Sequence, residues 1–288
     1  MELINKKENI FGDDIAFVEQ YDFSTANLSE ENRIKAITTV ASICYQNPKA
    51  IGSESLYNRL LAESKGLPSS SFEFVPVLLT AKKLRKIGSI INKEIYVKHD
   101  FEYNVTKFGE MIKDGTYLLT NLRALIADVG EYAKEFYNTP DECEIIKQHF
   151  KVFLFKVDLP TRSQMVRHRV SWQELSRRYV SGSRVPFEYY VSDKMKFISI
   201  HKDDESDIHF DSDDFNRICE ERYYQALEKG VKPQEARRVI PQSAYTQIWG
   251  AFMPNQLDNY FKLRLDKHAQ WEIQMVSKAM QELINGRK

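Results

Sequence analysis

The spacing of apolar residues changes along the chain between that of helices and that of strands, which predicts a mixed architecture. Over residues 31–46 apolar side chains recur every three or four positions, as on one face of a helix, and another helix is expected at 53–65. Residues 72–79 are rich in strand formers, and Pro76 restricts that strand to a sheet edge or a bulge. Residues 105–137 are predicted to be mainly helical, because their leucines fall on one helical face.

The second half of the chain continues the same mixture of elements. β-Branched and aromatic residues are concentrated at 150–157, which predicts a strand. A helix is expected over about 214–229, ending at Gly230, because glycine adopts the left-handed cap conformation without strain. An aromatic-rich strand at 243–252 and a final helix over about 255–285 complete the pattern.

Composition favours one globular protein without a strong overall electric field. The chain has 288 residues, 42% of them hydrophobic, and no repeat, low-complexity tract or linker divides it, so a single domain over 1–288 is expected. Lys plus Arg and Asp plus Glu both total 41, which gives no overall attraction to nucleic acid or to an anionic membrane. No apolar stretch is long enough to span a bilayer, and the N-terminus lacks the apolar core of a signal peptide. We therefore expect a cytoplasmic protein without a membrane partner.

Cysteines and acidic residues give no sign of a disulfide or of a metal site. Cys44, Cys143 and Cys219 are isolated and odd in number, so they are expected to be reduced thiols. The acidic stretch 203–214 lacks the central glycine and the ligand spacing of an EF-hand loop. It is predicted to be a solvated connection that ends at a helix N-terminus, and no metal is expected.

Three polar segments, 164–179, 235–241 and 263–272, concentrate arginine and histidine where a structural helix would carry a mixture of Lys and Glu. At 167–169 two arginines flank a histidine. On a helix three consecutive residues fan over about 200°, so these side chains are expected to reach different partners. Arginine offers a planar donor fork and stacks on aromatic rings. The triplet therefore suits a ligand with several phosphate oxygens and a flat polar ring, and a dinucleotide such as FAD has both parts.

The remaining polar residues suit a second, smaller anion. Ser176 and Arg178 supply a hydroxyl donor and a cation for another phosphate, and Glu174 can accept a hydrogen bond from a sugar or a base. Arg264 and His268 are four positions apart, which is expected to place them on one face of a helix.

Two plainer interpretations of these segments are open. The cations could form a surface patch paired with acids elsewhere, or a patch for an RNA backbone. Arg237 and Arg238 could simply follow the preference of a helix C-terminus for cations. An Arg-His-Arg triplet alone does not decide between these possibilities, whereas the three segments taken together are more specific.

Together, the three segments resemble the signature of flavin-dependent thymidylate synthases. The run RHRVSWQELSRRY resembles the family's Arg-His-Arg, spacer and Ser-x-Arg-Tyr. The later runs ARRVIP and NYFKLRLDKHAQWEIQ look like its nucleotide-binding arginine segment and its Leu-Arg-x-x-x-His-Ala-x-x-Glu-Ile segment, in the family's order. The resemblance covers about 150–280 and, less closely, 30–80. Residues 81–148 match no segment of the family and are expected to be an insertion.

The sequence departs from the family's pattern at two places besides this insertion. The spacer between Arg169 and Ser176 holds six residues, one fewer than is usual in the family. Before Phe72-Glu73, where the family usually has a histidine that touches FAD, this chain has Leu67-Pro68-Ser69.

The resemblance implies an α/β, or α+β, fold in a single domain, with a central twisted, mainly antiparallel sheet flanked by helices. It implies the conversion of dUMP to dTMP, with 5,10-methylenetetrahydrofolate as carbon donor, FAD as hydride carrier and NADPH as reductant. It also implies a homotetramer whose active sites lie between subunits.

The same resemblance assigns the site residues. Those implied to hold FAD are Arg167, His168, Arg169, Asn259 and His268. Those implied to bind dUMP are Gln164, Glu174, Ser176, Arg178, Arg237 and Arg264. Arg264 is also the catalytic residue, which would stabilise negative charge that develops on the uracil ring. These assignments require the guanidinium of Arg264 to lie near residues 167–178 of its own chain or of a neighbouring protomer.

Two other functions stay open at this point. A relative of the family could bind FAD and a pyrimidine nucleotide but carry out a different one-carbon or reductive reaction. A non-catalytic nucleic-acid-binding protein could use the cations from Arg162 to Arg178, although the zero net charge counts against it.

Overall fold

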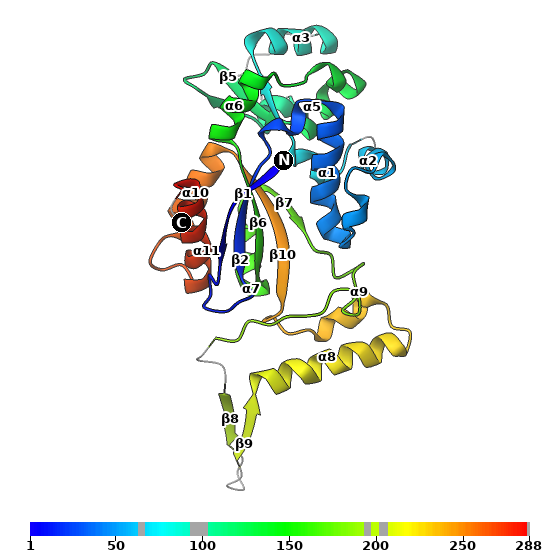
Figure 1. Ribbon diagram of the computed structural model, residues 1–288, viewed down its shortest axis with the longest axis vertical. Coiled ribbons are helices and arrows are strands. Elements are labelled where there is room, and N and C mark those ends of the chain that lie inside the picture. Colours follow the sequence, from blue (N-terminus) through cyan, green and yellow to red (C-terminus); the bar gives the residue numbers. More distant parts are fainter. Residues whose placement is uncertain (63–66, 93–102, 193–196, 202–206, 287–288) are drawn as a thin grey trace.

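The chain is built on a five-stranded sheet in which all neighbouring strands run antiparallel (Figure 1). The computed structural model describes residues 1–62, 67–92, 103–192, 197–201 and 207–286. In order across the sheet the strands are β1 (Glu2–Glu8), β2 (Phe17–Asp22), β6 (Lys151–Asp158), β10 (Tyr245–Phe252) and β7 (Ser171–Glu174). The expected α+β fold with a central antiparallel sheet is confirmed, and so are the strands predicted at 150–157 and 243–252.

Both faces of the sheet are buried at its centre, because β6 alternates large apolar residues toward each side. Phe153 and Phe155 belong to one core with residues of three helices, and Val152 and Leu154 belong to a second core. The helices of the first core are α7 (Leu159–Met165), α10 (Pro254–Arg264) and α11 (Trp271–Ile284). The second core contains α1 (Glu30–Tyr45), which confirms the helix predicted at 31–46, and α2 (Glu54–Leu61). Short 3-10 helices lie beside α1 at η1 (Ser24–Asn27) and η2 (Pro48–Ala50).

Strand β7 lies at one edge of the sheet and packs closely on β10. The side chain of Trp172 covers Gly250, where an added Cβ would lie 2.6 Å from Cζ3 of the indole. Glycine at this position therefore allows β7 to lie flat against its neighbour. The strand ends at Glu174, so this packing sets the position of one predicted site residue.

The described residues between 76 and 149 form a second layer of structure at the end of the main sheet where β10 finishes (Figure 1). Its sheet has the order β3 (Pro76–Leu79), β5 (Tyr117–Asn121) and β4 (Glu110–Ile112). Around it lie α3 (Ala81–Ile91), α4 (Asn104–Lys107), α5 (Leu122–Val129) and α6 (Pro140–His149), with 3-10 helices η3 (Ser70–Phe74) and η4 (Gly130–Glu135).

The prediction that 105–137 is mainly helical is wrong in part. Leu118 and Leu119 lie in β5, which pairs with strands on both sides. The side chain of Asn121 then accepts a hydrogen bond from the Ala124 N–H and begins α5. A run of apolar residues fits both periodicities, and here the pairing with distant strands decides the outcome. The strand predicted at 72–79 starts only at Pro76 and, as expected for proline, lies at a sheet edge.

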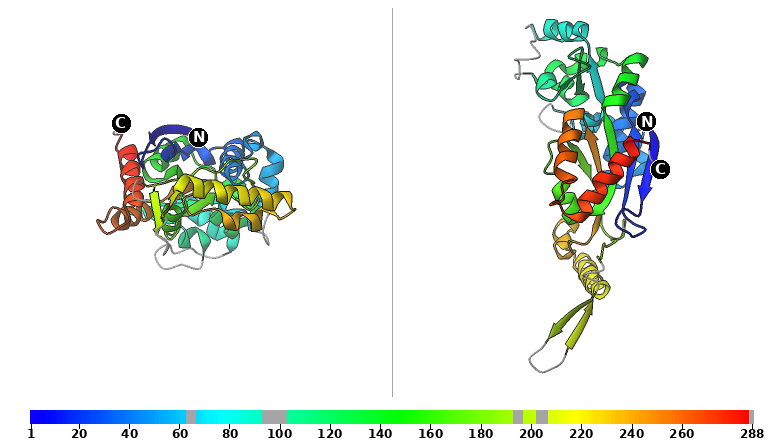
Figure 2. Two further views of the ribbon diagram at one scale, coloured as in Figure 1. Left: turned by 90° about the horizontal axis from the view of Figure 1, so that it is seen from below. Right: turned by 90° about the vertical axis from the view of Figure 1, so that its left-hand side faces the viewer.

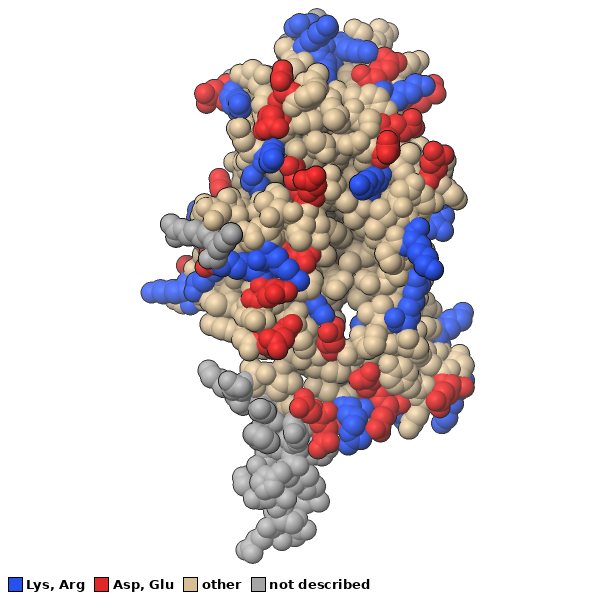
Figure 3. Space-filling model, viewed as in Figure 1, with Lys and Arg blue, Asp and Glu red and all other residues tan. Residues whose placement is uncertain are grey.

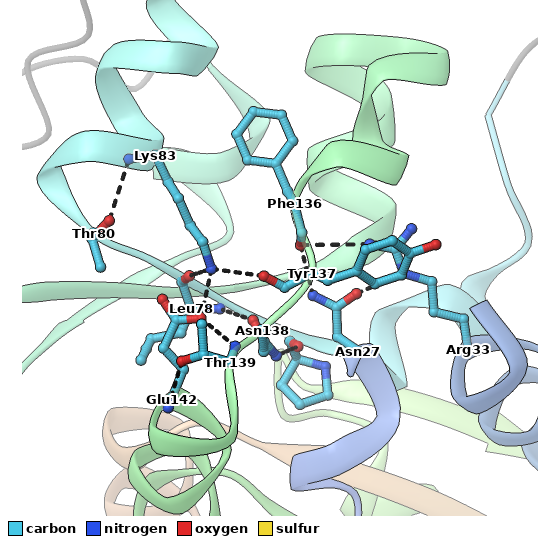
Figure 4. A network of polar contacts seen from close by, with 11 residues as sticks. Asn27, Arg33, Leu78, Thr80, Lys83, Phe136, Tyr137, Asn138, Thr139 and Glu142 are labelled. Atoms are coloured by element: carbon cyan, nitrogen blue, oxygen red, sulfur yellow. Dashed lines mark hydrogen bonds and ion pairs between the residues drawn. The ribbon is translucent and has the colours of Figure 1, made fainter. Parts of the chain in front are cut away.

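Buried polar contacts hold this second layer together (Figure 4). The ammonium of Lys83 donates to the carbonyl oxygens of Leu78 and Tyr137, at 3.1 and 2.9 Å, and forms an ion pair with Glu142 at 2.6 Å. The guanidinium of Arg33 donates to the Ala133 carbonyl oxygen at 3.1 Å and thereby joins α1 to the same layer. Because buried charges need partners, these contacts fix the layer in one arrangement.

The other end of the molecule is an arm formed by α8 (Ser212–Glu228) and the hairpin of β8 (Phe197–His201) and β9 (Asp207–Asp211), which project from the sheet (Figures 1 and 2). Helix α9 (Pro233–Ala236) and the 3-10 helix η6 (Arg237–Val239) lead back to β10. Gly230 has a positive φ of 81°, which confirms it as the end of the predicted helix. Part of the acidic stretch 203–214 is strand β9 and not a solvated connection, whereas residues 203–206 lie outside the described residues.

The final helix predicted over 255–285 is two helices, because the chain turns after Arg264. The carboxylate of Asp266 accepts a hydrogen bond from the His268 N–H at 2.8 Å, and the Asp266 carbonyl oxygen accepts one from Ala269. The three cysteines are free thiols, and Cys44 and Cys143 are buried. Within the described parts of the chain, no helix combines the length and apolarity that a membrane span requires.

Candidate active site

The first predicted segment begins in α7 and continues as a turn. The helix has Pro160 in its first turn and ends at Met165, so Arg167, His168 and Arg169 lie in the turn that follows it. Arg167 and Arg169 are exposed, whereas His168 is buried, with 7% of its surface accessible. The three side chains do reach different surroundings, as predicted.

Arg264 meets this turn across about 100 residues of sequence. Its Nε donates to Nε2 of His168 at 2.7 Å, and its Nη2 donates to the Gln164 carbonyl oxygen at 2.9 Å. The His168 ring also packs against the ring of Tyr260, one turn earlier on α10, with centroids 4.7 Å apart. The expectation that the Arg264 guanidinium lies beside the Arg-His-Arg segment is therefore confirmed within one chain.

The contact with Arg264 defines the state of the His168 ring. A guanidinium can only donate, so Nε2 of His168 must accept, and the ring is neutral with its proton on Nδ1. Burial, followed by the nearby charge of Arg264, lowers the pKa of His168 to about 4. A neutral histidine at neutral pH thus acts as a fixed acceptor that orients Arg264.

Two other predicted FAD residues lie near the surface. His268 is not on a helical face with Arg264, because α10 ends at Arg264 and His268 follows in the turn. Its side chain is exposed, and Nδ1 lies 2.9 Å from the Asp266 carboxylate. Asn259 is exposed on α10. The structure therefore brings neither residue into the contact between His168 and Arg264.

A second cluster surrounds Glu174 at the end of β7. Its carboxylate forms an ion pair with Arg162 of α7, whose Nε donates at 2.8 Å, and accepts a hydrogen bond from the Thr246 hydroxyl at 3.1 Å. Glu174, Arg162 and Thr246 line a cavity of about 490 Å³ together with Ser176 and Arg237. Three predicted dUMP residues, from segments about 60 residues apart, therefore share one cavity.

Other cations of the predicted segments have different surroundings. The Arg177 guanidinium lies 4.3 Å from the centre of the Phe187 ring and donates to the carbonyl oxygens of Val185 and Pro186, so it holds the following loop. Arg178 is exposed, and its Nε donates to the Gln234 side chain at 3.3 Å. It does not line the cavity around Glu174.

A third feature is a cavity of about 720 Å³ beside Arg169. Arg169 lines it, and the Gln256 side chain of α10 donates to the Arg169 carbonyl oxygen at 3.0 Å. On the face of the molecule in Figure 3, charges of both signs alternate without a broad field of one sign. Anion binding on this face must therefore come from local clusters, as expected from the zero net charge.

Sequence reasoning did not assign roles to three residues that shape these clusters. Arg162 and Thr246 hold Glu174, and Tyr260 packs against His168. A signal was present for Tyr260, which lies four positions before Arg264 and so shares its helical face. Nothing in the sequence around Thr246 indicates its role, because only the pairing of β7 with β10 places it beside Glu174.

The fold and these clusters define an α+β protein with separate cationic sites suited to anionic ligands. The sequence model of one protein family, described as thymidylate synthase complementing protein, matches residues 143–287, about half of the chain. The chain therefore belongs to this family.

Curated relatives carry the name flavin-dependent thymidylate synthase. The protein from Thermotoga neapolitana is 35% identical over 136 residues, 46% of this chain and 61% of the relative. The protein from Thermus thermophilus is 31% identical over 159 residues, 52% of this chain and 56% of the relative. The chain thus spans about three fifths of the length of these relatives. A crystal structure of a UMP/dUMP methylase from Streptomyces cacaoi is 24% identical, with a TM-score of 0.36 over 46% of this chain and 66% of that one.

Proposed function

We propose that this chain is a flavin-dependent thymidylate synthase. It would convert dUMP to dTMP with 5,10-methylenetetrahydrofolate as carbon donor, and with FAD, reduced by NADPH, as hydride source. The observation that carries the proposal is the contact of Arg264 with His168 and Gln164, because it joins two of the family's signature segments in space. Family membership supports the same conclusion.

The residues present fit a flavin dinucleotide. Arg167 and Arg169 offer exposed guanidiniums, and the cavity beside Arg169 also has amide and apolar side chains on its walls. Planar guanidiniums match phosphate oxygens, and apolar walls with a few polar groups match a flat ring. We propose that Arg167 and Arg169 hold FAD together with Asn259, His268 and the Nδ1–H of His168. FAD, when bound, supplies the hydride.

The cavity around Glu174 is the proposed site of dUMP. Ser176 and Arg237 would bind its phosphate with Arg178 nearby, and Glu174 would accept a hydrogen bond from the sugar or base, assisted by Gln164. Arg264 would stabilise negative charge on the uracil ring as C5 becomes nucleophilic. His168 would keep the guanidinium of Arg264 in one orientation.

The arrangement supports a homotetramer with active sites between subunits. Arg264, Asn259 and His268 line neither the cavity around Glu174 nor the cavity beside Arg169 in their own chain. A neighbouring protomer would bring them to these cavities. The three free cysteines are in keeping with a cytoplasmic enzyme, because that compartment keeps thiols reduced.

The proposed reaction is tested by the visible absorption spectrum of the purified protein and by tritium release from C5 of dUMP. We expect an oxidised flavin spectrum that dUMP perturbs, and tritium release and dTMP formation that require NADPH and methylenetetrahydrofolate. Arg264→Ala should keep FAD but abolish methyl transfer. The matched control is Lys262→Ala, an exposed cation on the same helix.

Each alternative function corresponds to a distinct outcome of these measurements. A flavin spectrum that responds to dUMP without dTMP formation would indicate a relative with a different reaction. A colourless protein whose RNA or DNA affinity falls steeply with salt would indicate a nucleic-acid-binding protein.

A further inference from the structure

Described residues of the segment 81–148, which we expect to be an insertion, form one wall of the cavity of about 720 Å³ beside Arg169. This wall consists of α4, the start of β4 and the start of α5, and includes Lys107, Phe108 and Arg123. The opposite wall consists of the turn 169–171, the end of β10 and the start of α10. The match to the family begins at residue 143, so the wall made by the insertion lies outside it.

Direct contacts fix the wall made by the insertion, one to residues 68–73 and one to the opposite wall. The Arg123 guanidinium forms an ion pair with Glu73 at 2.6 Å and donates through Nε to the Pro68 carbonyl oxygen at 2.9 Å. Both carboxylate oxygens of Glu110 accept from the Asn255 N–H, at 3.1 Å each, in the first turn of α10. The cavity is therefore a built feature of the fold, in which the insertion is attached to the helix that carries Arg264.

The chain is closely packed at Gly109, which lines this cavity beside Phe108. At Gly109 an added Cβ would lie 2.4 Å from the Val105 carbonyl oxygen and 2.8 Å from a Leu118 methyl carbon. Only glycine fits there, and Phe108 lies on the cavity wall with 53% of its surface accessible. An exposed aromatic ring in a cavity is unusual for a purely structural residue and is well suited to contact a flat ligand.

Cations accompany this ring on both walls. Lys107 is exposed, with its Nζ 5.5 Å from the centre of the Phe108 ring, and Arg169 is exposed across the cavity. Nε and Nη1 of Arg123 are engaged by Pro68 and Glu73, and among the described residues no hydrogen bond engages its Nη2, which could donate to a ligand. Apolar surface beside cations suits a flat heteroaromatic ring joined to an anionic tail.

We propose that the insertion contributes Phe108, Lys107 and Arg123 to the binding of such a ligand in this cavity. The inference rests on the proposed function, because two ligands of that reaction, FAD and the folate, have this chemistry. Phe108 would contact the ring, and Lys107 and Arg123 would lie near the anionic groups. The insertion would then be part of the binding site, and not merely a peripheral addition to the fold.

The test compares Phe108→Ala and Lys107→Met with matched substitutions elsewhere in the insertion. Tyr132→Ala removes an exposed ring and Lys82→Met removes an exposed cation, and neither side chain lines the cavity. The dissociation constant for FAD is measured by flavin fluorescence with protein stripped of flavin. That for tetrahydrofolate, used as an unreactive folate, is measured by calorimetry with FAD-loaded protein.

We expect Phe108→Ala to raise the dissociation constant of one of the two ligands about tenfold, because a stacked ring contributes on this scale. Lys107→Met should raise it about threefold and reduce its dependence on salt. The ligand that responds identifies the occupant of the cavity. Because both residues are exposed, the thermal unfolding midpoint should stay unchanged and shows whether a variant is folded.

Dissociation constants for both ligands within twofold of those of the Tyr132→Ala and Lys82→Met controls would overturn the inference, as would a wild-type protein that binds neither ligand. Failure of the proposed reaction is separate. A wild-type protein that binds FAD but forms no dTMP would contradict the proposed function, whereas the comparison of dissociation constants would still decide the role of the insertion.

Discussion

Replacing His168 removes the acceptor that orients Arg264 but keeps the guanidinium itself. We expect this change to weaken dUMP binding and to slow tritium release from C5 of dUMP. In His168→Ala the Nε–H of Arg264 loses the partner that now lies 2.7 Å away, while its Nη2 keeps the Gln164 carbonyl oxygen at 2.9 Å. A hydrogen bond to a charged group contributes about 1.5–3 kcal/mol. This corresponds to a factor of about ten to a hundred in a rate or binding constant. Because one of two contacts remains, we expect a loss of about tenfold.

The assay follows tritium release from C5 of dUMP and the dissociation constant of dUMP, at constant flavin occupancy. The amide oxygen of a glutamine can also accept from a guanidinium, so His168→Gln should recover most of the activity that His168→Ala loses. In a double-mutant cycle on the dissociation constant of dUMP, His168→Ala should have little further effect once Arg264→Ala is present. A merely structural role for His168 would weaken dUMP binding equally in both backgrounds.

The same ring makes stability depend on pH in a defined direction. Burial and Arg264 lower the pKa of His168 to about 4 from its ordinary value of 6.5. Between these pH values the unfolded chain binds a proton that the folded chain excludes, so stability falls as pH decreases through this window and is unaffected above it. From pH 7 to about 4.5 the loss attributable to this group is about 2 kcal/mol.

Urea unfolding of the wild-type protein and of His168→Gln at both pH values measures this difference, because glutamine does not titrate. Equal losses of stability on acidification in both proteins would contradict a buried, neutral His168. Tritium release at the wild-type rate by His168→Ala, with wild-type affinity for dUMP, would contradict its role in orienting Arg264.

Three further substitutions test separate parts of the structure. Lys83→Met should lower the free energy of unfolding by about 3 kcal/mol, because it leaves the buried carboxylate of Glu142 without its cation. Urea unfolding measures this loss, and Lys82→Met, which removes an exposed lysine, is the control. Arg162→Met should weaken dUMP binding about tenfold in calorimetry, since Glu174 loses the cation that orients it, and Arg162→Lys should recover part of the affinity. Unchanged affinity in Arg162→Met would contradict the proposed dUMP site. Gly250→Ala should lower the free energy of unfolding by about 1–3 kcal/mol, because the added Cβ would collide with the indole ring of Trp172.

The periodicity of the sequence located the elements whose own residues determine their structure. The strand at 150–157 was predictable because its β-branched and aromatic residues fill both cores, and Gly230 marked the end of α8 by its backbone conformation. The leucines of β5 were assigned to a helix because an apolar run fits either periodicity, and its strand partners come from elsewhere in the chain. The prediction that His268 shares a helical face with Arg264 was also wrong, because the helix ends at Arg264 and the chain turns at Asp266.

The contact between Arg264 and the Arg-His-Arg segment was predictable because the resemblance named both segments. The protonation state and the hydrogen-bonding role of His168 in this contact were not predictable. That His168 serves as a buried neutral acceptor depends on the packing of Tyr260 and on the turn after α7, which no local pattern encodes. The cavity beside Arg169 was equally hidden, because the residues between 104 and 127 that line it lie outside the match to the family, and only the folded chain shows which of their side chains face Arg169.

Helix α7 limits how the proposed nucleotide preference of this protein could be changed. Arg162 and Gln164 are two positions apart, so they project about 200° from one another around a helix of only seven residues. The Arg162 side chain donates to Glu174, and the Gln164 carbonyl oxygen accepts a hydrogen bond from Arg264. A substitution that tilts α7 would disturb both Glu174 and Arg264. Directed evolution of the proposed base or sugar preference should therefore keep α7 unchanged and vary β7 and the loop after it.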